Sequence, residues 1–377
     1  MLSGELWPAH PHPYPGECLS SWIVRTAHHN GLKLQTFSDL VFGKNNQIWN
    51  RDIDRLAPRF VLQNMSNRTV TSLKEANKST LKLYTNRLFP ALKPSGIMRW
   101  INPLVLHHRK HTGFGMQFCP LCLLEDNEPY FRIAWRLSLY TFCPVHQVMM
   151  EDRCLCGASV NFHRIELGKA NQFEPSTLDE CYLCGQKLKA IQPRNIQLLP
   201  KSVYTIWNRV LGVITRGFIN TGPINYERLI LLHQICKIIV SPRFNQNIRK
   251  YICSKSSLPF LDISKHRYFE QYNVDERHSI LRLAWWLVGN TNKKLKESIR
   301  KNAIQNNYLY MRYTHIYICV PEDLIGTDYL IFDSVGNMVR SGRVSDLEIQ
   351  LEVEDLAKGF YVVSLDGVYF EKVLILE

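Results

Sequence analysis

Seven cysteines and one histidine form four closely spaced pairs within residues 119–184, and these pairs constrain the fold more than any other feature. A turn that places one or two residues between ligands lets both side chains reach one ion, and two such turns complete the tetrahedral shell of Zn²⁺. The sequence therefore predicts two structural Zn²⁺ ions, one in a Cys₃His site and one in a Cys₄ site. The predicted ligands are Cys119, Cys122, Cys143, His146, Cys154, Cys156, Cys181 and Cys184.

The spacing of these pairs leaves several details of the sites open. Protein ligands fill all four positions of each predicted site, which is typical of structural zinc because catalytic zinc keeps one position for water. Sequential sites are the simplest arrangement, but interleaved sites also fit the spacing, and His163 is an alternative to a neighbouring ligand. An iron–sulfur cluster is the main alternative for the four-cysteine set, although its spacing matches neither common ferredoxin pattern.

Length and composition indicate a globular protein of several domains. The chain has 377 residues, of which 45% are hydrophobic, so it can bury more than one core. No apolar run approaches the ~18 residues of a membrane span, and the N-terminus lacks the basic start and apolar stretch of a signal peptide. We therefore expect a cytoplasmic protein without a membrane partner, in which paired cysteines bind metal more often than they form disulfides.

The net charge of +13 is unevenly distributed along the chain. It is +9 over residues 1–118, −2 over 119–190, +13 over 191–310 and −7 over 311–377. Two basic segments on either side of a nearly neutral one favour a polyanionic partner such as nucleic acid. A soluble protein that is merely basic is the alternative. Trp207, Trp285 and Trp286 lie in the second basic segment and recur with leucines at helical spacing. This spacing predicts that they are buried in the core, and it makes stacking on nucleic-acid bases the less favoured alternative.

Hydrophobic periodicity predicts a multidomain, mainly α-helical protein. Helical spacing over Glu17–Asn30 and again over Leu34–Phe42 gives the outline of a helix-turn-helix. A further three or four helices follow between residues 202 and 310, and alternation of β-branched residues then predicts antiparallel strands, the first over Tyr310–Val320. We predict an arm and helix-turn-helix domain (1–118), a tandem zinc-finger module (119–190), a basic helical domain (191–309) and a small acidic β-rich domain (310–377).

Three histidines just before the first cysteine pair raise the question of catalysis. His107, His108 and His111 resemble the way in which HNH-type nucleases present a metal-activated water. No carboxylate follows them before Glu125, and the chain has neither a phosphate-binding loop nor a nucleophile elbow. A non-catalytic protein is the favoured interpretation. An HNH-like endonuclease and a sequence-specific DNA-binding regulator are the alternatives.

Several short motifs in a fixed order resemble the TniQ/TnsD family. The run from Glu17 to Gly31 matches the family's opening pattern of an acidic residue followed by x-Leu-x-Ser-Trp-x-x-Arg-x-Ala-x-x-Asn-Gly. The runs Phe118-Cys-Pro-Leu-Cys, Trp135-Arg and Phe142-Cys-Pro-Val-His then resemble the family's central zinc module in the same order. The likeness covers about residues 8–190, and the acidic β-rich tail departs from the family pattern.

This resemblance implies a subunit that selects the target site in DNA transposition and does not itself cut DNA. Such a protein links a DNA target, or a CRISPR RNA-guided Cascade complex, to the AAA+ ATPase that regulates transposition. The family includes proteins of CRISPR-associated transposons, and the resemblance implies that this chain could be one of them. It also implies that a homodimer can form. We expect contacts with nucleic acid or a partner from six basic residues, namely Arg25, Lys33, Arg282, Lys293, Lys294 and Lys296.

Overall fold

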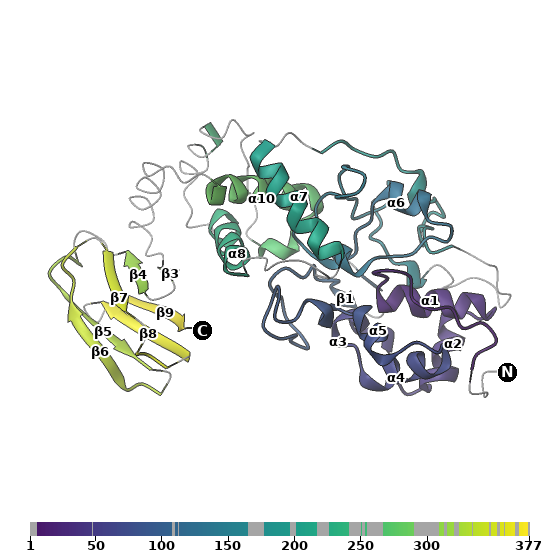
Figure 1. Ribbon diagram of the computed structural model, residues 1–377, viewed down its shortest axis with the longest axis horizontal. Helices are drawn as coiled ribbons and strands as arrows, with labels where there is room; N and C mark the ends of the chain where they lie inside the picture. The colour runs from purple at the N-terminus through teal and green to yellow at the C-terminus, as the bar shows by residue number, and fades with distance from the viewer. Residues whose placement is uncertain are drawn as a thin grey trace. The chain divides into compact units, whose positions relative to one another are not determined.

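Figure 1 shows the computed structural model, which is mainly helical and has strands toward the C-terminus. Contacts divide the chain into two compact units, one formed by Met1–Pro242 with Ile252–Gly289 and the other by Arg243–Tyr251 with Asn290–Glu377. The structure describes residues 6–46, 48–107, 110–111, 113–164, 177–196, 201–216, 226–240, 250, 253–254, 267–289, 309–312, 315–319, 324–333, 335–346, 348–352, 355–357, 359–365 and 369–375.

Short helices build the N-terminal part of the first unit. Every residue of the first helix from Leu19 to Ala27 is buried, so this helix is surrounded by protein. Gly31 ends it with a φ of 66°, a left-handed conformation that glycine adopts without strain. The helices are α1 (Leu19–His29), α2 (Leu34–Phe42), α3 (Ile53–Leu56), α4 (Arg59–Arg68) and α5 (Leu73–Lys78), with the 3₁₀ turns η1 (Ile48–Asn50) and η2 (Leu81–Tyr84).

The region that contains the cysteine pairs has little regular structure and builds its core from aromatic rings. Phe118, Phe131, Trp135 and Phe142 are each at most 1% exposed. Burying such large rings supplies the apolar contact that a region of short elements otherwise lacks. Its elements are the hairpin of β1 (Leu106–His107) and β2 (Lys110–His111), α6 (Pro120–Glu125), η3 (Ile133–Arg136), η4 (Phe162–Arg164) and η5 (Leu188–Ala190).

The later helices pack directly against this region. The ring of Trp207 lies 5.0 Å from that of Phe142, and its Nε1–H donates to the carbonyl of Leu139 at 3.1 Å. Trp207 and Trp285 are buried, as the sequence predicts, and Trp286 is half-buried. These helices therefore belong to the same compact unit as the region with the cysteine pairs. The elements are α7 (Lys201–Thr215), α8 (Tyr226–Val240), η6 (Phe269–Gln271) and α10 (Val274–Gly289).

Buried arginines connect parts of the first unit that are distant in sequence. Arg136 is completely buried and forms ion pairs with Asp52 at 2.6 Å and with Asp54 at 3.1 Å. Arg277 on α10 is also completely buried, and its guanidinium donates to the side-chain oxygens of Asn102 and Gln117. Removing either guanidinium would leave buried polar groups without a partner.

Two antiparallel sheets form the second unit. One sheet has the strand order β3-β4-β7 and the other has the order β6-β5-β8-β9. Ile349 of the first sheet shares a buried cluster with Ile331 and Val363 of the second, so the sheets pack face to face. The strands are β3 (Leu309–Arg312), β4 (His315–Cys319), β5 (Asp328–Phe332), β6 (Met338–Arg343), β7 (Glu348–Glu352), β8 (Gly359–Leu365) and β9 (Tyr369–Ile375).

The sequence predicts one strand over Tyr310–Val320, but the structure has two strands there, β3 and β4. β3 and β4 pair with each other as an antiparallel hairpin in which Arg312 lies opposite His315. Alternating side chains predict extended backbone equally well for one long strand and for a tight hairpin. Asp333 stabilises the turn between β5 and β6, because its side chain accepts hydrogen bonds from the backbone N–H groups of Val335 and Asn337.

Candidate metal centres

The structure brings the eight predicted ligands together as two groups of four. Cys119, Cys122, Cys143 and His146 form the first group, and Cys154, Cys156, Cys181 and Cys184 form the second. In each group the possible ligand atoms all lie within 4.8 Å of one another. The grouping is sequential, with two neighbouring pairs in each cluster. His163 belongs to neither group and stacks instead on the ring of Trp49, with centroids 5.5 Å apart.

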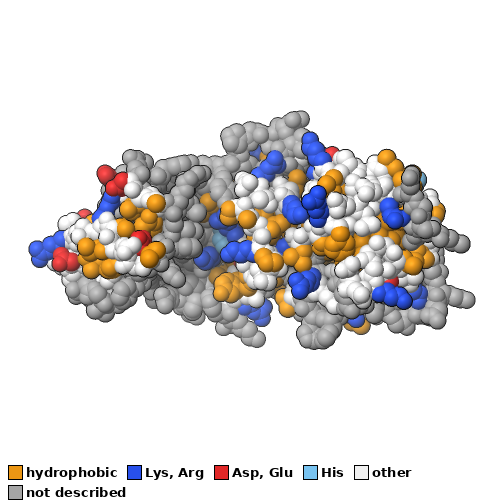
Figure 2. Space-filling model, turned by 90° about the horizontal axis from the view of Figure 1, so that it is seen from below, with side chains coloured by type: hydrophobic (Ala, Val, Ile, Leu, Met, Phe, Trp, Pro, Cys, Tyr) orange, Lys and Arg blue, Asp and Glu red, His pale blue; other side chains and the backbone are white. Residues whose placement is uncertain are grey.

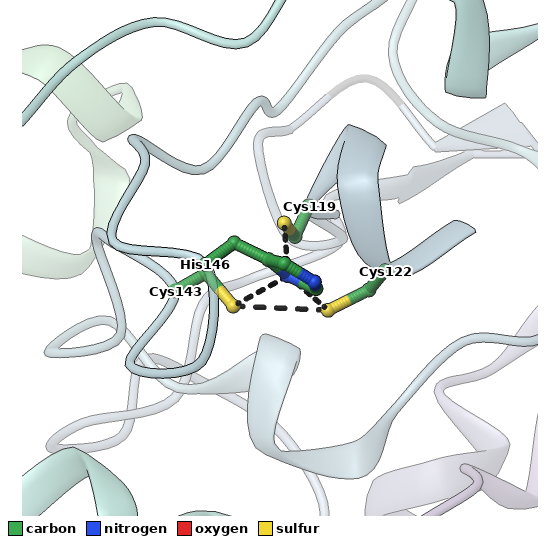
Figure 3. A group of neighbouring side chains, drawn as sticks. All are labelled: Cys119, Cys122, Cys143 and His146. Carbon is green, nitrogen blue, oxygen red and sulfur yellow. Dashed lines mark hydrogen bonds between the residues drawn. The ribbon is translucent and has the colours of Figure 1, made fainter. Parts of the chain in front are cut away.

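Helix α6 and a tight turn position the first group. Cys119 is the N-cap of α6 and Pro120 follows at the first helical position, where its missing N–H costs nothing. Cys143 and His146 lie in a turn in which the backbone N–H of Gln147 donates to the carbonyl of Cys143 at 2.9 Å. Figure 3 shows the four side chains converging on one point from these two elements.

The distances within the first group fit a tetrahedral metal ion. With Zn–S of about 2.3 Å and Zn–N of about 2.0 Å, the edges of a tetrahedron are about 3.8 Å between two sulfurs and about 3.5 Å between sulfur and nitrogen. The Sγ atoms of Cys122 and Cys143 are 3.7 Å apart, and His146 Nδ1 lies 3.5 Å from Cys119 Sγ and from Cys143 Sγ. The geometry therefore matches a Cys₃His site with four protein ligands.

Glu125 orients the histidine of this group. Its Oε2 lies 2.8 Å from His146 Nε2, on the side of the ring away from the three thiols. A hydrogen bond from Nε2–H to the carboxylate leaves the lone pair of Nδ1 free to bind a cation, as in many zinc sites. The spacing of the cysteine pairs alone does not indicate this role of Glu125. Its position three residues after Cys122, on the same face of α6, is the signal that could have revealed it.

The crowded thiols perturb one another's acidity. Hydrogen bonds from Cys119 and Cys122 hold the pKa of Cys143 well below its usual value, despite burial. Hydrogen bonds from Cys119 and Cys143, together with burial, raise the pKa of Cys122. A divalent cation resolves this competition because it lets every sulfur bind as a thiolate.

Two glycine-ended turns build the second group. The backbone N–H of Gly157 donates to the carbonyl of Cys154 at 2.8 Å, and that of Gly185 donates to the carbonyl of Cys181 at 2.9 Å. Both glycines have left-handed φ values, of 85° and 73°, which other residues adopt only with strain. The paired Sγ distances, 3.6 Å from Cys154 to Cys184 and 3.7 Å from Cys156 to Cys181, again fit the edges of a zinc tetrahedron.

The two groups differ in their access to solvent. The three cysteines of the first group are at most 7% exposed. In the second group Cys154 and Cys181 are buried, whereas Cys156 and Cys184 are exposed. A reagent in solution can therefore reach two sulfurs of the second group directly. In the first group the half-buried His146 is the most accessible ligand.

The histidines that motivated the nuclease alternative lie in or beside the small hairpin of the first unit. His107 ends β1 and His111 ends β2, whereas His108 lies outside the described residues. Within the described part of the chain, the groups that could hold a metal ion contain none of these histidines. Both groups that do exist have four protein ligands, which is the arrangement of structural sites.

The structure places Arg25 in the interior of the first unit. Its side chain is 2% exposed and forms a bidentate pair with the buried Glu17 through Nε at 3.1 Å and Nη2 at 2.8 Å. The same guanidinium lies over the ring of Tyr14, 4.1 Å from its centroid. Arg25 thus holds the N-terminal arm against α1, and this burial leaves no surface on which it could meet nucleic acid.

The other predicted contact residues lie in different environments. Arg282 is buried within α10 at 6% exposure, where it cannot contact a partner from the surface. Lys33 is half-buried immediately before α2. Lys293, Lys294 and Lys296 lie outside the described residues.

The residues of the opening motif form one connected network around α1. Ser21 Oγ donates to Glu17 at 2.8 Å and accepts from the backbone N–H of Phe131 at 3.1 Å, which ties α1 to the metal-cluster region. Trp22 Nε1–H donates to the carbonyl of Pro11 at 2.7 Å, and Asn30 Nδ2 donates to that of Ala9. The motif therefore fixes the arm, the helix and the first metal group relative to one another.

This architecture defines a mainly helical protein whose first helix is hydrogen-bonded to a region with two clusters that could each hold a metal ion. Residues 8–150 match the TniQ family model, so this part of the chain is similar to a TniQ domain. The match suggests an adaptor role associated with DNA transposition. No curated protein matches the sequence. Among the described residues, no helix has both the length and the apolar character needed to cross a membrane.

Proposed function

We propose that the protein is a non-catalytic adaptor that selects the integration site in DNA transposition. It links a nucleic-acid target, either a DNA site or a CRISPR RNA-guided Cascade complex, to the AAA+ ATPase that regulates the transposase. The observation that carries the proposal is the match to the TniQ family model over residues 8–150, a stretch that contains the complete first metal group. Its motif residues have structural contacts and form no catalytic arrangement among themselves.

Both clusters bind Zn²⁺ in this proposal, and the ions are structural. Each cluster offers four nitrogen or sulfur ligands at the spacing that tetrahedral zinc prefers. The metal would cross-link segments that regular secondary structure does not hold, as it does in small zinc fingers. In the first cluster it would join α6 to the turn at Cys143, and in the second it would join the turns at Cys154 and Cys181.

Helices α1 and α2 serve as a helix-turn-helix, with α2 as the exposed element. Its outward residues Gln35, Thr36 and Leu40 are exposed, and Leu40 reaches 63% exposure. No residue of α2 is a lysine or an arginine, so the helix has no side chain suited to a phosphate. This composition fits a protein partner, either the ATPase or the target complex, better than a nucleic-acid backbone.

Affinity purification of the intact protein from its native host tests the adaptor role. The proposal predicts co-purification of a AAA+ ATPase together with a nucleic-acid-bound target complex, and retention of the ATPase after nuclease treatment. Leu40→Lys should weaken one of these associations, whereas the conservative Leu40→Met should not. An ATPase that fails to bind either the protein or its target complex would contradict the proposal.

A cleavage assay separates the adaptor from the nuclease alternative. The purified protein, incubated with DNA and Mg²⁺ or Mn²⁺, should leave the DNA intact. Metal-dependent cleavage that His108→Ala abolishes would overturn the non-catalytic assignment.

A further inference from the structure

The segment that contains η2 and runs up to the first metal group has a one-sided charge. Residues 55–118 contain 11 lysines and arginines but only one acidic residue, Glu75. That carboxylate is already paired with Lys78 at 2.5 Å. The basic side chains around η2 and its following loop are called here the η2 surface; they are Arg59, Lys82, Arg87, Lys93 and Arg99.

Hydrogen bonds bring these side chains together from separate segments. Lys82 Nζ donates to the carbonyl of Ala57 at 3.1 Å, which places it beside the start of α4, where Arg59 is exposed. Arg99 Nε donates to the carbonyl of Leu88 at 3.1 Å, which places it beside Arg87. These bonds place Lys82 near Arg59 and Arg99 near Arg87.

A buried arginine holds the loop that contributes Lys93. The guanidinium of Arg55 donates to the carbonyls of Lys93, Ser95 and Gly96 at 2.6–2.8 Å. The loop is thus fixed in position before any partner binds.

Two carboxylates of this region have a buried partner. Asp52 at the N-cap of α3 and Asp54 within α3 both form ion pairs with Arg136. Within the residues that the structure describes, Arg59, Lys82 and Lys93 form no ion pair with a carboxylate. On the face drawn in Figure 2, lysine and arginine side chains likewise outnumber acidic ones among the coloured residues.

We propose that the η2 surface binds the phosphate backbone of the target nucleic acid. The inference rests on the proposed adaptor role, to which it adds a specific contact surface. Exposed lysines and arginines bind phosphates regardless of base sequence and make the affinity depend on salt. This surface takes the role that the sequence analysis gave to Arg25 and Arg282, both of which are buried.

Salt-dependent binding of the full-length, zinc-loaded protein tests the inference. Fluorescence anisotropy is measured with a labelled duplex DNA and with a labelled single-stranded RNA over a range of salt concentrations. Arg59→Gln with Lys93→Gln removes two phosphate contacts, which should flatten the log–log salt slope by about 1.8 and weaken binding at about 0.1 M salt by about 60-fold. Whichever probe shows this change identifies the nucleic acid that the surface prefers.

Two matched variants control for charge and for folding. Arg59→Lys with Lys93→Arg keeps both charges and should retain the affinity and salt slope of the wild type. Arg209→Gln with Lys237→Gln removes the same charge from exposed positions on α7 and α8 and should leave the slope unchanged. Circular dichroism and zinc content should be the same in all variants.

Several results would overturn the inference. These are absence of binding to both probes, an unchanged slope in the Arg59/Lys93 variant, or an equal loss in the α7/α8 control, which would indicate diffuse attraction by net charge. The ATPase pull-down with the same variants keeps this test separate from the adaptor role. Loss of nucleic-acid binding with retained ATPase binding supports both proposals, whereas binding at the η2 surface without any ATPase contact would sink the adaptor role alone.

Discussion

Removing the Glu125 carboxylate should weaken metal binding at the first cluster and leave the second cluster unchanged. The carboxylate accepts from His146 Nε2 and so fixes the ring with Nδ1 toward the three thiols. Loss of such an orienting partner typically lowers metal affinity about 10- to 100-fold. Because the Glu125 side chain is 67% exposed, water can replace part of its effect, and we expect Glu125→Ala to fall at the low end, about tenfold.

Competition with a zinc chelator measures this change site by site. Two equivalents of zinc should compete with separable affinities in the wild type, and only the affinity of the Cys₃His site should fall in Glu125→Ala. Glu125→Gln can still accept the hydrogen bond and should lie between the two. Glu75→Ala removes another exposed carboxylate, which pairs with Lys78, and serves as the control.

Alanine at position 125 is also a good helix former, so lost helicity of α6 would not explain a weaker site. Equal zinc affinity in Glu125→Ala and wild type would refute the orienting role of this carboxylate. A parallel fall at both clusters would point instead to general destabilisation.

Three further predictions concern stability and metal release. Arg136→Met leaves the carboxylates of Asp52 and Asp54 without their buried partner, and should lower the free energy of unfolding in urea by about 3–5 kcal/mol; a loss below about 1 kcal/mol would mean that the pair behaves like an exposed one. Gly185→Ala forces a side chain into a left-handed turn and should cost about 1 kcal/mol and reduce zinc occupancy of the second cluster, whereas Gly212→Ala inside α7 should stabilise the protein slightly; the opposite ranking in thermal unfolding would contradict this account. A thiol-reactive reagent should release zinc in two phases, the fast one from the second cluster, where Cys156 and Cys184 are exposed. Replacing both by serine should abolish the fast phase, and its persistence would show that exposure does not set the order.

Local patterns in the sequence predicted which cysteine and histidine side chains cluster, and several of the elements. Their spacing identified the four pairs, but only the structure shows that neighbouring pairs share a group. Leu34–Phe42 is helical over the predicted range because its apolar spacing and the following Gly43 mark both its face and its end. The four-domain division and the roles of Lys293, Lys294 and Lys296 stay predictions.

Long-range burial of charge was the part that the sequence could not reveal. The residues next to Arg25 in the sequence suggest a surface position. Only its contacts with Glu17 and Tyr14 in the structure show that it is buried and holds the N-terminal arm in place. Arg136 likewise finds its partner Asp52 far away in the sequence. With Arg25 and Arg282 assigned to the interior, exposed basic residues around η2, such as Arg59 and Lys93, become the candidate contact residues.

Zinc-edge X-ray absorption, combined with metal analysis, tests the central claim most directly. Two closed clusters of protein ligands predict two zinc ions per chain and an average shell with sulfur and nitrogen in the ratio seven to one, because seven cysteines and one histidine supply all the ligands. Distances of about 2.3 Å to sulfur and about 2.0 Å to nitrogen should account for the whole shell. Fewer than two ions per chain, or an oxygen ligand that indicates bound water, would contradict the claim that both sites are closed and structural.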